Sequence, residues 1–481
     1  MTPAFRAGSA PGGPGKGHSG GMGAPTLTFL GGAGTVTGSK YLLSHGQRRV
    51  LVDAGVFQGE KQLRLRNWEP LAVPPASIEA ILLTHAHTDH VGYLPRLVAE
   101  GFSGRVYATA ATVDLAGIVL TDAAFLAERD AEHAASHGYS RHDPPLPLFR
   151  IEDVERALGL FRVVDHDTEE DLGHGWSARW TRAGHILGAA SIRVSLPSTS
   201  VLFSGDLGRA SHPVLRPRET PPGADVVLVE STYGDREHPE PDGPPHEGLA
   251  DLIRRTVARG GSILLPAFAV DRTEVVLQTV TELMRDGRIP ELPVFVNSPM
   301  ALAALDVYRN PRYAGELRPD LDATGFVDLP RLREVRSTED SIRLNHPAVP
   351  SLIISSSGMA TGGRVLHHLE HLLPEPRNAV VLTGYQAIGT RGRALADGAT
   401  QLKLHGREIP VRAEVLVDEE FSVHADRSEL LDWLGALAPA PRQVFTVHGD
   451  ADSADALARE VRKRLDLPAR AAVLDETVSL T

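Results

Sequence analysis

The sequence of 481 residues contains no cysteine. This absence excludes disulfide bonds, thiolate metal sites and cysteine nucleophiles, so any bound metal must take histidine and carboxylate ligands. We also find no apolar run of membrane-spanning length, and no basic segment followed by an apolar core at the N-terminus. The sequence therefore predicts neither a membrane partner nor a secretory signal, and a cytoplasmic location is expected.

Basic residues are also in deficit. Lys and Arg number 49 against 61 Asp and Glu, which gives a formal net charge of −12 and a pI near 6.0. Nucleic-acid-binding proteins usually carry a basic surface, so the charge counts mildly against a nucleic-acid substrate without excluding one. An acidic protein can still present a local cationic groove, and bound divalent metals add positive charge where a phosphate sits.

The length and the 42% hydrophobic content exceed what one ordinary core needs. We therefore expect two domains, or one domain that carries a large insertion. Helical and strand-like apolar patterns alternate along the chain, which favours a layered α/β fold. Residues 1–24 are rich in Gly, Pro, Ser and Ala and predict a disordered tail. Residues 236–247 predict a linker, after which a new series of strands and helices begins.

The most informative motif is a hexad of metal-binding residue types. His85, His87, Asp89 and His90 lie within six residues that follow 78–84, a short apolar run consistent with a buried strand. In a loop, His85 and His87 can converge on one metal ion, while Asp89 and His90 serve a second ion close by. Nitrogen and oxygen ligands of this kind suit Zn²⁺.

Two metal ions need further ligands, and three residues downstream follow predicted strands or apolar runs. His185 is flanked by glycines after a predicted strand, Asp206 ends the strand 201–203, and His448 ends another apolar run. A carboxylate at a strand end, such as Asp206, can bridge two cations. Asp53 also ends a strand and could accept an N–H from a ligand histidine, although an aspartate that caps a turn explains it as well.

These residues resemble the metallo-β-lactamase superfamily, and three more segments resemble its β-CASP branch, which processes nucleic acids. Glu230 in VESTYG looks like motif A of that branch, His424 in FSVHAD like motif B, and His448 in VHG like motif C. The resemblance covers the chain from about residue 26 to the C-terminus. It is closest to bacterial and archaeal relatives of the endonuclease subunit of the cleavage and polyadenylation specificity factor.

The resemblance implies an αββα sandwich interrupted by a β-CASP α/β domain. The expected boundaries are 25–235 and 397–481 for the sandwich and 236–396 for the insertion. It also implies two zinc ions per chain, an RNA substrate and a homodimer. By resemblance, one zinc ion takes His85, His87 and His185, the other takes Asp89, His90 and His448, and Asp206 bridges them.

The implied chemistry is hydrolysis of a phosphodiester bond. Two zinc ions lower the pKa of a bridging water and clamp the phosphate, so Asp89 and Asp206 count as catalytic residues as well as ligands. The leaving 3′-oxygen needs a proton, and His424 paired with Glu230 resembles the family's arrangement for that role. The expected products carry 5′-phosphate and 3′-hydroxyl ends. Internal cutting and cutting from a 5′ end both stay open.

Candidate phosphate contacts lie in the predicted insertion. Ser356, Ser357 and Gly358 follow a predicted strand and offer hydroxyl and N–H groups to an anion, although a simple turn into a helix explains them equally well. Arg391 and Arg393 form a cationic glycine-rich loop, and Arg272 is a weaker candidate. The glycine-rich turn 31–38 does not match the dinucleotide fingerprint, so no nucleotide cofactor is expected.

Three positions depart from the family pattern. Asn297 stands where Asp is expected, Asp271 where Gly is expected, and Asp450 where Glu is common. None removes a ligand. Two alternatives to a ribonuclease remain: a hydrolase of small esters or thioesters, and a non-catalytic RNA-binding scaffold. The ester hydrolase would need neither Glu230 nor His424, nor an insertion of about 160 residues, which exceeds usual loop lengths. The scaffold would lack several ligands that this chain keeps.

Overall fold

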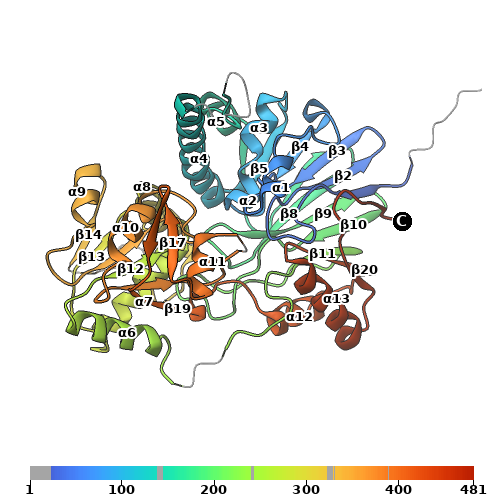
Figure 1. Ribbon diagram of the computed structural model, residues 1–481. Helices are drawn as coiled ribbons and strands as arrows, with labels where there is room; N and C mark the ends of the chain where they lie inside the picture. The colour runs from blue at the N-terminus through green and yellow to red at the C-terminus, as the bar shows by residue number, and fades with distance from the viewer. Residues whose placement is uncertain (1–22, 138–144, 240–242, 322–328, 330, 388) are drawn as a thin grey trace, which may run out of the picture.

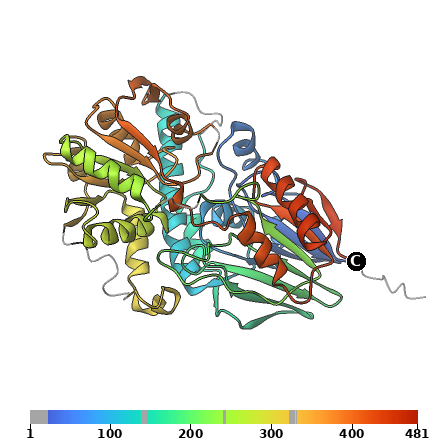
Figure 2. The ribbon, with the colours of Figure 1, turned by 90° about the horizontal axis from the view of Figure 1, so that it is seen from below.

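The computed structural model describes residues 23–137, 145–239, 243–321, 329, 331–387 and 389–481. The expected tail lies outside these residues except for Gly23 and Ala24. The chain forms a two-sheet sandwich, coloured blue, green and dark red in Figure 1, and a second α/β domain, coloured lime to orange, beside it. Figure 2 shows the same two parts from below.

The first sheet of the sandwich is built mainly from the N-terminal part of the chain. Strands β22, β1, β2 and β3 pair antiparallel, whereas β3 to β6, at the other side of the sheet, run parallel. In spatial order the strands are β22 (Thr477–Ser479), β1 (Thr26–Phe29), β2 (Tyr41–His45), β3 (Arg48–Val52), β4 (Ala80–Leu82), β5 (Arg105–Thr109) and β6 (Phe161–Val164).

The second sheet combines a central hairpin series with strands from the C-terminal part. Strands β10, β11, β20 and β21 run parallel, so their carboxyl ends meet at one edge. In spatial order the strands are β21 (Ala469–Ala471), β20 (Gln443–Val447), β11 (Val226–Glu230), β10 (Thr199–Phe203), β9 (Ala190–Leu196), β8 (Trp176–Arg182) and β7 (Glu169–Gly173).

The two sheets pack face to face over a dry core. Phe29, Trp176, Trp180 and Phe203 are among its largest fully buried side chains. Helices cover the outer faces, so the predicted αββα sandwich is confirmed. These helices are α1 (Lys61–Arg66), α2 (Thr88–Val91), α3 (Leu94–Ala99), α4 (Ala110–His137), α5 (Ile151–Leu158), α12 (Arg427–Gly435) and α13 (Ala451–Leu465), with the short 3₁₀ helices η1 (Pro75–Ser77) and η3 (Glu419–Phe421).

The inserted domain is a six-stranded sheet in which every pairing is parallel, with helices packed on it. Its strands, in spatial order, are β14 (Leu332–Glu334), β13 (Val294–Val296), β15 (Leu352–Ser355), β12 (Ile263–Pro266), β16 (Ala379–Leu382) and β19 (Glu414–Val417). Its helices are α6 (Glu247–Ala258), α7 (Arg272–Arg285), α8 (Pro299–Tyr308), η2 (Pro311–Glu316), α9 (Thr338–Arg343), α10 (Arg364–Leu372) and α11 (Arg391–Ala396), and the hairpin β17 (Gln401–Leu404) and β18 (Arg407–Pro410) projects from it.

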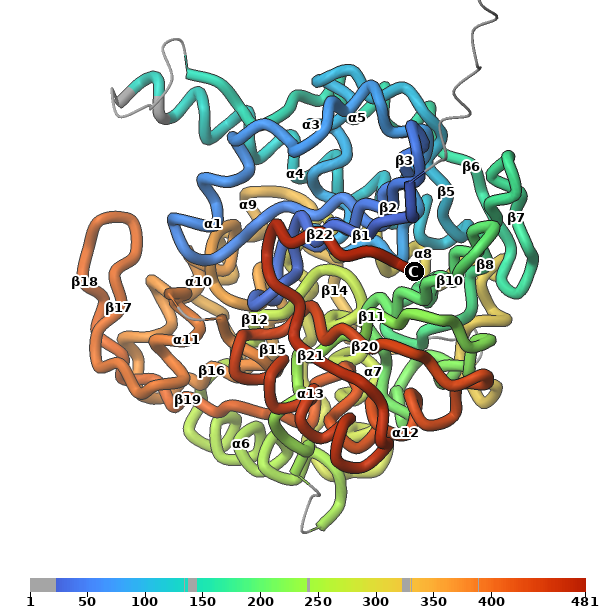
Figure 3. The backbone as a smooth tube through the Cα atoms, turned by 90° about the vertical axis from the view of Figure 1, so that its right-hand side faces the viewer, coloured from blue at the N-terminus to red at the C-terminus, as the bar shows by residue number. Residues whose placement is uncertain are grey.

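The insertion continues past its expected end at residue 396. Strand β19 pairs with β16 of the inserted sheet, and the β17–β18 hairpin precedes it. The chain therefore returns to the sandwich after Val417. It then supplies β20 and β21 to the second sheet, and finally β22, which pairs with the first strand β1. Figure 3 shows this last strand, in dark red, alongside β1 in blue.

Helix α4 corrects one expectation drawn from the sequence. Residues 110–133 are long and apolar enough, by composition alone, to cross a membrane. In the fold, however, this helix packs against α5 and α8 and against strands β5 and β6. Its first part is packed between the sandwich and the inserted domain, with Leu115, Ala116 and Leu120 fully buried, whereas Phe125 and Leu126 further along are exposed.

Candidate metal centre and active site

The hexad begins directly after strand β4. Leu83 and Thr84 follow that strand, His85 is fully buried beyond them, and His87 is the N-cap residue of the short helix α2. Asp89 and His90 then lie in the first turn of α2. The strand-to-helix turn thus aims four ligand-type side chains at one place, as the sequence predicts.

The other three side chains reach the same place from the second sheet. His185 lies in the loop after β8, Asp206 follows β10, and His448 follows β20. The His185 and Asp206 loops touch, because the N–H of Gly208 donates to the carbonyl of Ala183 at 2.9 Å. A Cβ on residue 208 would lie 1.7 Å from a backbone oxygen of the His185 loop, so only glycine fits there.

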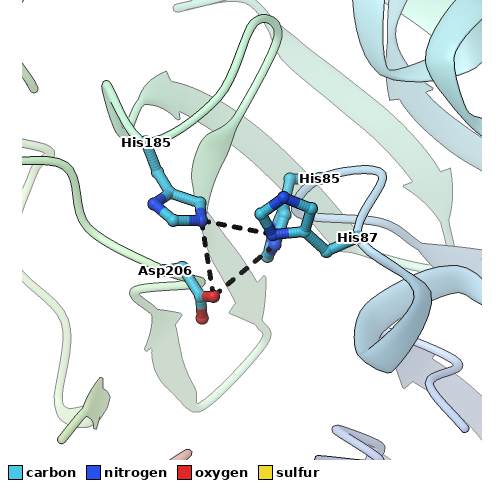
Figure 4. A group of neighbouring side chains, drawn as sticks. All are labelled: His85, His87, His185 and Asp206. Carbon is cyan, nitrogen blue, oxygen red and sulfur yellow. Dashed lines mark hydrogen bonds and ion pairs between the residues drawn. The ribbon is translucent and has the colours of Figure 1, made fainter. Parts of the chain in front are cut away.

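The seven side chains form two groups that share Asp206. Its Oδ2 lies 3.6 Å from Nε2 of both His85 and His185, and His185 Nε2 lies 3.3 Å from His87 Nδ1 (Figure 4). The other carboxylate oxygen of Asp206, Oδ1, lies 3.3 Å from His90 Nε2 and 3.6 Å from His448 Nε2. Asp89 joins this second group, with Oδ2 at 3.7 Å from His448 Nε2. Each oxygen of Asp206 therefore faces one group.

Several of the atoms that face inward are buried and have no hydrogen-bond partner among the residues that the structure describes. They include Nε2 of His85 and His90 and Oδ1 of Asp206. Buried polar atoms are otherwise almost always paired, because leaving them unpaired is costly. Converging nitrogen and oxygen atoms of this kind are the donor set that Zn²⁺ takes. The two groups, His85, His87, His185 and Asp206 and then Asp89, His90 and His448, could each hold a divalent metal ion.

A second layer of hydrogen bonds fixes the histidine rings. Asp53 is buried and accepts from the Nδ1 side of His90 at 2.8 Å and from the N–H of Thr84 at 2.8 Å. The Thr84 hydroxyl donates to Asp53 at 2.9 Å and so is left to accept from His85 Nδ1 at 3.0 Å. Ser39 lies 2.8 Å from His448 Nδ1. These contacts leave Nε2 of all three rings for the centre. The sequence pointed to Asp53, but nothing in it marked Thr84 or Ser39.

The histidines of the site differ in their electrostatics: three have lowered pKa values, whereas for His90 burial is outweighed by the charges of Asp206 and Asp53, which raise the pKa well above its usual value. Burial lowers the pKa values of His85, His87 and His185. Burial acts to raise the pKa of Asp206, but the surrounding histidines outweigh it and hold that pKa well below its usual range. Deprotonated imidazoles and an ionised carboxylate are the forms that bind metals.

His424 stands beside the first group of side chains. Its ring centroid lies 4.4 Å from that of His185, and its Nδ1 lies 3.4 Å from Oε1 of the fully buried Glu230. Glu230 is held by the N–H of Leu207 at 2.7 Å. Burial acts to lower the pKa of His424, but Glu230 outweighs it and raises that pKa. Nδ1 of His424 therefore faces Glu230, while its ring lies against His185 of the first group.

The candidate phosphate contacts gather at the carboxyl edge of the inserted sheet. The Ser356 hydroxyl is buried without a partner there, while the Ser357 hydroxyl lies 2.9 Å from that of Thr361. The N–H of Gly392 donates to the carbonyl of Met359, which joins this turn to the start of α11. The structure thus brings together the residues that the sequence separates by more than 30 positions.

The three candidate arginines differ in burial and in the groups that they bind. Arg391 donates to the carbonyl of Lys403 at 3.0 Å, and Arg393 pairs with Asp397 at 2.9 Å. Arg272 is buried and donates to the carbonyl of Thr383, and burial lowers its pKa. Its charge lies near His424, whose pKa it acts to lower. Gln386 links this region to the serine turn, since its amide group bonds the carbonyls of Gly358 and Gly384.

An αββα sandwich with two groups of metal-ligand side chains at one edge, and a second domain inserted before the last ligand, defines a metallohydrolase. Family models match successive parts of the chain: the metallo-β-lactamase superfamily over residues 33–267, the β-CASP domain over residues 273–395 and the Zn-dependent metallo-hydrolase RNA specificity domain over residues 408–472. The chain belongs to the metallo-β-lactamase superfamily, in its β-CASP branch.

Similar proteins come from bacteria and archaea. The chain is 39% identical to ribonuclease TTHA0252 of Thermus thermophilus over 89% of this chain and 94% of that protein. It is 31% identical to the transcription termination factor FttA of Methanosarcina mazei (94% and 71%) and 28% identical to an RNase J-like protein of Methanocaldococcus jannaschii (92% and 96%). A solved structure of a protein of unknown function from Enterococcus faecalis shares the fold, with a TM-score of 0.52 and 13% identity over 95% of this chain and 100% of that one.

Proposed function

We propose that this protein is a zinc-dependent ribonuclease that acts in the cytoplasm on single-stranded RNA and leaves 5′-phosphate and 3′-hydroxyl ends. The observation that carries the proposal is the placement of Asp206 between two histidine groups, with the His424–Glu230 pair beside it. The similarity to a Thermus ribonuclease along nearly the whole chain supports RNA as the substrate.

Zinc ions held by the two groups would supply a water of lowered pKa and positive charge for the scissile phosphate. The chain's own residues do the rest. Asp206 keeps the two groups at a fixed separation, and Asp89 faces His448 in the second one. Glu230 holds the Nδ1 side of His424, so that Nε2 carries the proton that the leaving 3′-oxygen requires. Ser356, Ser357, Gly358, Arg272, Arg391 and Arg393 are the proposed contacts to the RNA backbone.

The test is cleavage of single-stranded RNA, labelled at either end, by zinc-loaded protein. We expect Asp206→Ala to lose both metal ions and all activity, because it removes the shared carboxylate. We expect His424→Ala to keep the metal ions and lose activity about 10²–10⁴-fold, the usual contribution of a positioned acid. His367→Ala, which removes an exposed histidine of α10, is the matched control and should behave as the wild type.

Labels at the two ends separate internal from terminal cutting, and end-group analysis identifies the 5′-phosphate. Wild-type protein that binds zinc but leaves RNA intact would contradict the proposal, and small esters and thioesters would then be the substrates to assay. Light scattering during size-exclusion chromatography tests the proposed homodimer. A measured mass equal to that of one chain would contradict it.

A further inference from the structure

The loop that carries His185 is held by two side chains of the inserted domain. The N–H of Leu187 donates to the hydroxyl of Tyr308 at 3.1 Å, and the N–H of Gly188 donates to Oε2 of Glu316 at 2.8 Å. Tyr308 is the last residue of α8 and is fully buried, and Glu316 ends η2. Two successive amides of a loop in the sandwich thus depend on acceptors more than 100 residues away in the other domain.

Tyr308 is itself fixed by a buried chain of hydrogen bonds. Its hydroxyl donates to Oδ1 of Asp271 at 2.9 Å, and Oδ2 of Asp271 lies 3.3 Å from Nε2 of His212. His212 accepts two backbone N–H groups at Nδ1, so its proton is on Nε2 and points to Asp271. The chain of bonds therefore starts in the sandwich at His212, crosses the inserted domain, and returns to the sandwich at Leu187.

Asp271 adopts an unfavourable backbone conformation to take part. Its φ of 70° and ψ of −52°, with a bond from the N–H of Arg272 to the carbonyl of Val270 at 3.0 Å, form the γ-turn with positive φ, which is rare and strained for residues with a side chain. The family resemblance predicts glycine here, which adopts such angles freely. The chain keeps an aspartate in a turn that favours glycine, and its carboxylate is the group that holds Tyr308.

We propose that Tyr308, held by Asp271, and Glu316 are positioning residues for His185, so that the seating of the inserted domain sets the metal affinity of the group formed by His85, His87 and His185. Within the sandwich the loop is also held by the N–H of Gly208, and by the hydroxyls of Thr109 and Thr112, which donate to the carbonyl of Gly188; the inserted domain adds the support of the two amides. The effect on RNA cleavage rests on the proposed function, whereas the effect on metal affinity does not.

A second tyrosine provides a control that distinguishes positioning of the ligand loop from a general contribution to the interface between the domains. The hydroxyl of Tyr313, in η2, donates to Asp114 of α4, which is also a tyrosine–aspartate bond between the inserted domain and the sandwich. Neither residue touches the His185 loop by any bond in the described part of the chain. Tyr313→Phe therefore removes a bond of the same kind from the same interface without removing a support of the ligand loop.

The experiment titrates zinc into metal-free wild type, Tyr308→Phe and Tyr313→Phe against a competing chelating dye. We expect Tyr308→Phe to bind one of its two zinc equivalents about 10–100-fold more weakly, the usual effect of losing a partner that orients a ligand. Tyr313→Phe should bind both equivalents as the wild type does. With excess zinc, kcat of Tyr308→Phe should recover while KM stays unchanged. Equal zinc affinities in all three proteins, or the same loss in both variants, would overturn the proposal.

Asp271→Gly keeps the test decisive if Tyr308→Phe does not fold. Glycine relieves the γ-turn, so this variant should be no less heat-stable than Tyr308→Phe, yet it should weaken the same zinc equivalent. The double variant Asp271→Gly/Tyr308→Phe should show no further loss, since both residues act through one chain of bonds. Wild-type zinc affinity in Asp271→Gly would overturn the proposal. If wild-type protein did not cut RNA but the variants still bound zinc more weakly than wild type, only the proposed function would be contradicted.

Discussion

Asn297 stands where the β-CASP resemblance predicts aspartate, and its neighbour His368 gives a physical reason. The Asn297 amide donates to Nε2 of His368 at 2.6 Å, and Nδ1 of His368 lies 2.8 Å from the side-chain oxygen of Asn345. An amide donor suits a neutral imidazole, which accepts at Nε2. Burial lowers the pKa of His368 to about 4, so this ring stays neutral in the folded protein.

This pairing predicts a loss of stability in mild acid. At pH 5 the unfolded chain, in which the His368 pKa is 6.5, binds a proton that the folded chain, with a pKa of about 4, does not bind. Proton binding to the unfolded chain destabilises the fold, so stability falls as pH drops from 7 to 5, by roughly 1–2 kcal/mol from this residue. Asn297→Asp supplies an acceptor for the protonated ring and should remove that loss. Urea unfolding of both metal-free proteins at the two pH values measures it, and identical pH dependence would contradict the assignment.

Single positions also show what the sequence could reveal about the site. The hexad follows a predicted strand, and so do His185, Asp206 and His448. The pattern of strand ends therefore predicted that these side chains approach one edge of the sheets. Thr84, Ser39 and Tyr308 carry no such mark. They act through hydrogen bonds to partners that only the folded chain brings near, and a hydroxyl group in a sequence does not indicate which ring or amide it will meet.

Among the elements, helix α12 matters most for His424. Its N-cap Asp426 accepts from the N–H of Glu429 at 3.1 Å, and Glu429 in return accepts from the N–H of Asp426, which forms a capping box. Asp426 also accepts the N–H of His238 at 3.2 Å, and His238 lies 2.9 Å from the carbonyl of His424. The start of this helix therefore supports the backbone carbonyl of His424 through His238.

Asp426→Ala should consequently affect both stability and catalysis. Loss of the cap lowers the free energy of unfolding by about 1 kcal/mol. Because His424 loses its backbone support, kcat on RNA should also fall, roughly tenfold or more, while both metal ions stay bound. Ser337→Ala removes the N-cap of α9, whose hydroxyl accepts from the N–H of Asp340 at 3.0 Å far from the site. That control should lose similar stability and keep kcat, and equal kcat values for the two variants would refute the role given to α12.

The sequence did not mark the strand β19, which lies beyond residue 396 and pairs with the inserted sheet. Strand β19 is only four residues long and follows a hairpin, so no change of composition near residue 396 or 417 marks the return to the sandwich. Its membership in the inserted sheet depends on pairing with β16, a contact between distant segments. Helix α4 also departs from the sequence analysis, which found no apolar run of membrane-spanning length, and only the fold reveals its partners α5 and α8.

At the scale of the whole molecule, the protein is acidic, whereas the proposed RNA substrate is a polyanion that an acidic surface repels. With a net charge of −12, non-specific attraction to a polyanion is weak, and binding has to come from local groups at the candidate site. The proposed site offers the metal groups and a few arginines at the edge of the inserted sheet. Few phosphates are then neutralised, which distinguishes this protein from binders that depend on an extended basic face.

The salt dependence of RNA binding measures how many phosphates are engaged. Each contact to single-stranded RNA contributes about −0.7 to the slope of log affinity against log salt, so about three arginine contacts predict a slope near −2. The His424→Ala variant, loaded with zinc, allows binding to be followed by fluorescence anisotropy without cleavage. Replacing both Arg391 and Arg393 with alanine should flatten the slope by about 1 or more, whereas Arg343→Ala, an exposed arginine of α9, should leave it unchanged. A slope steeper than about −6 would mean that RNA lies along a broad basic surface. Binding through a few local groups would then be refuted even if cleavage were observed.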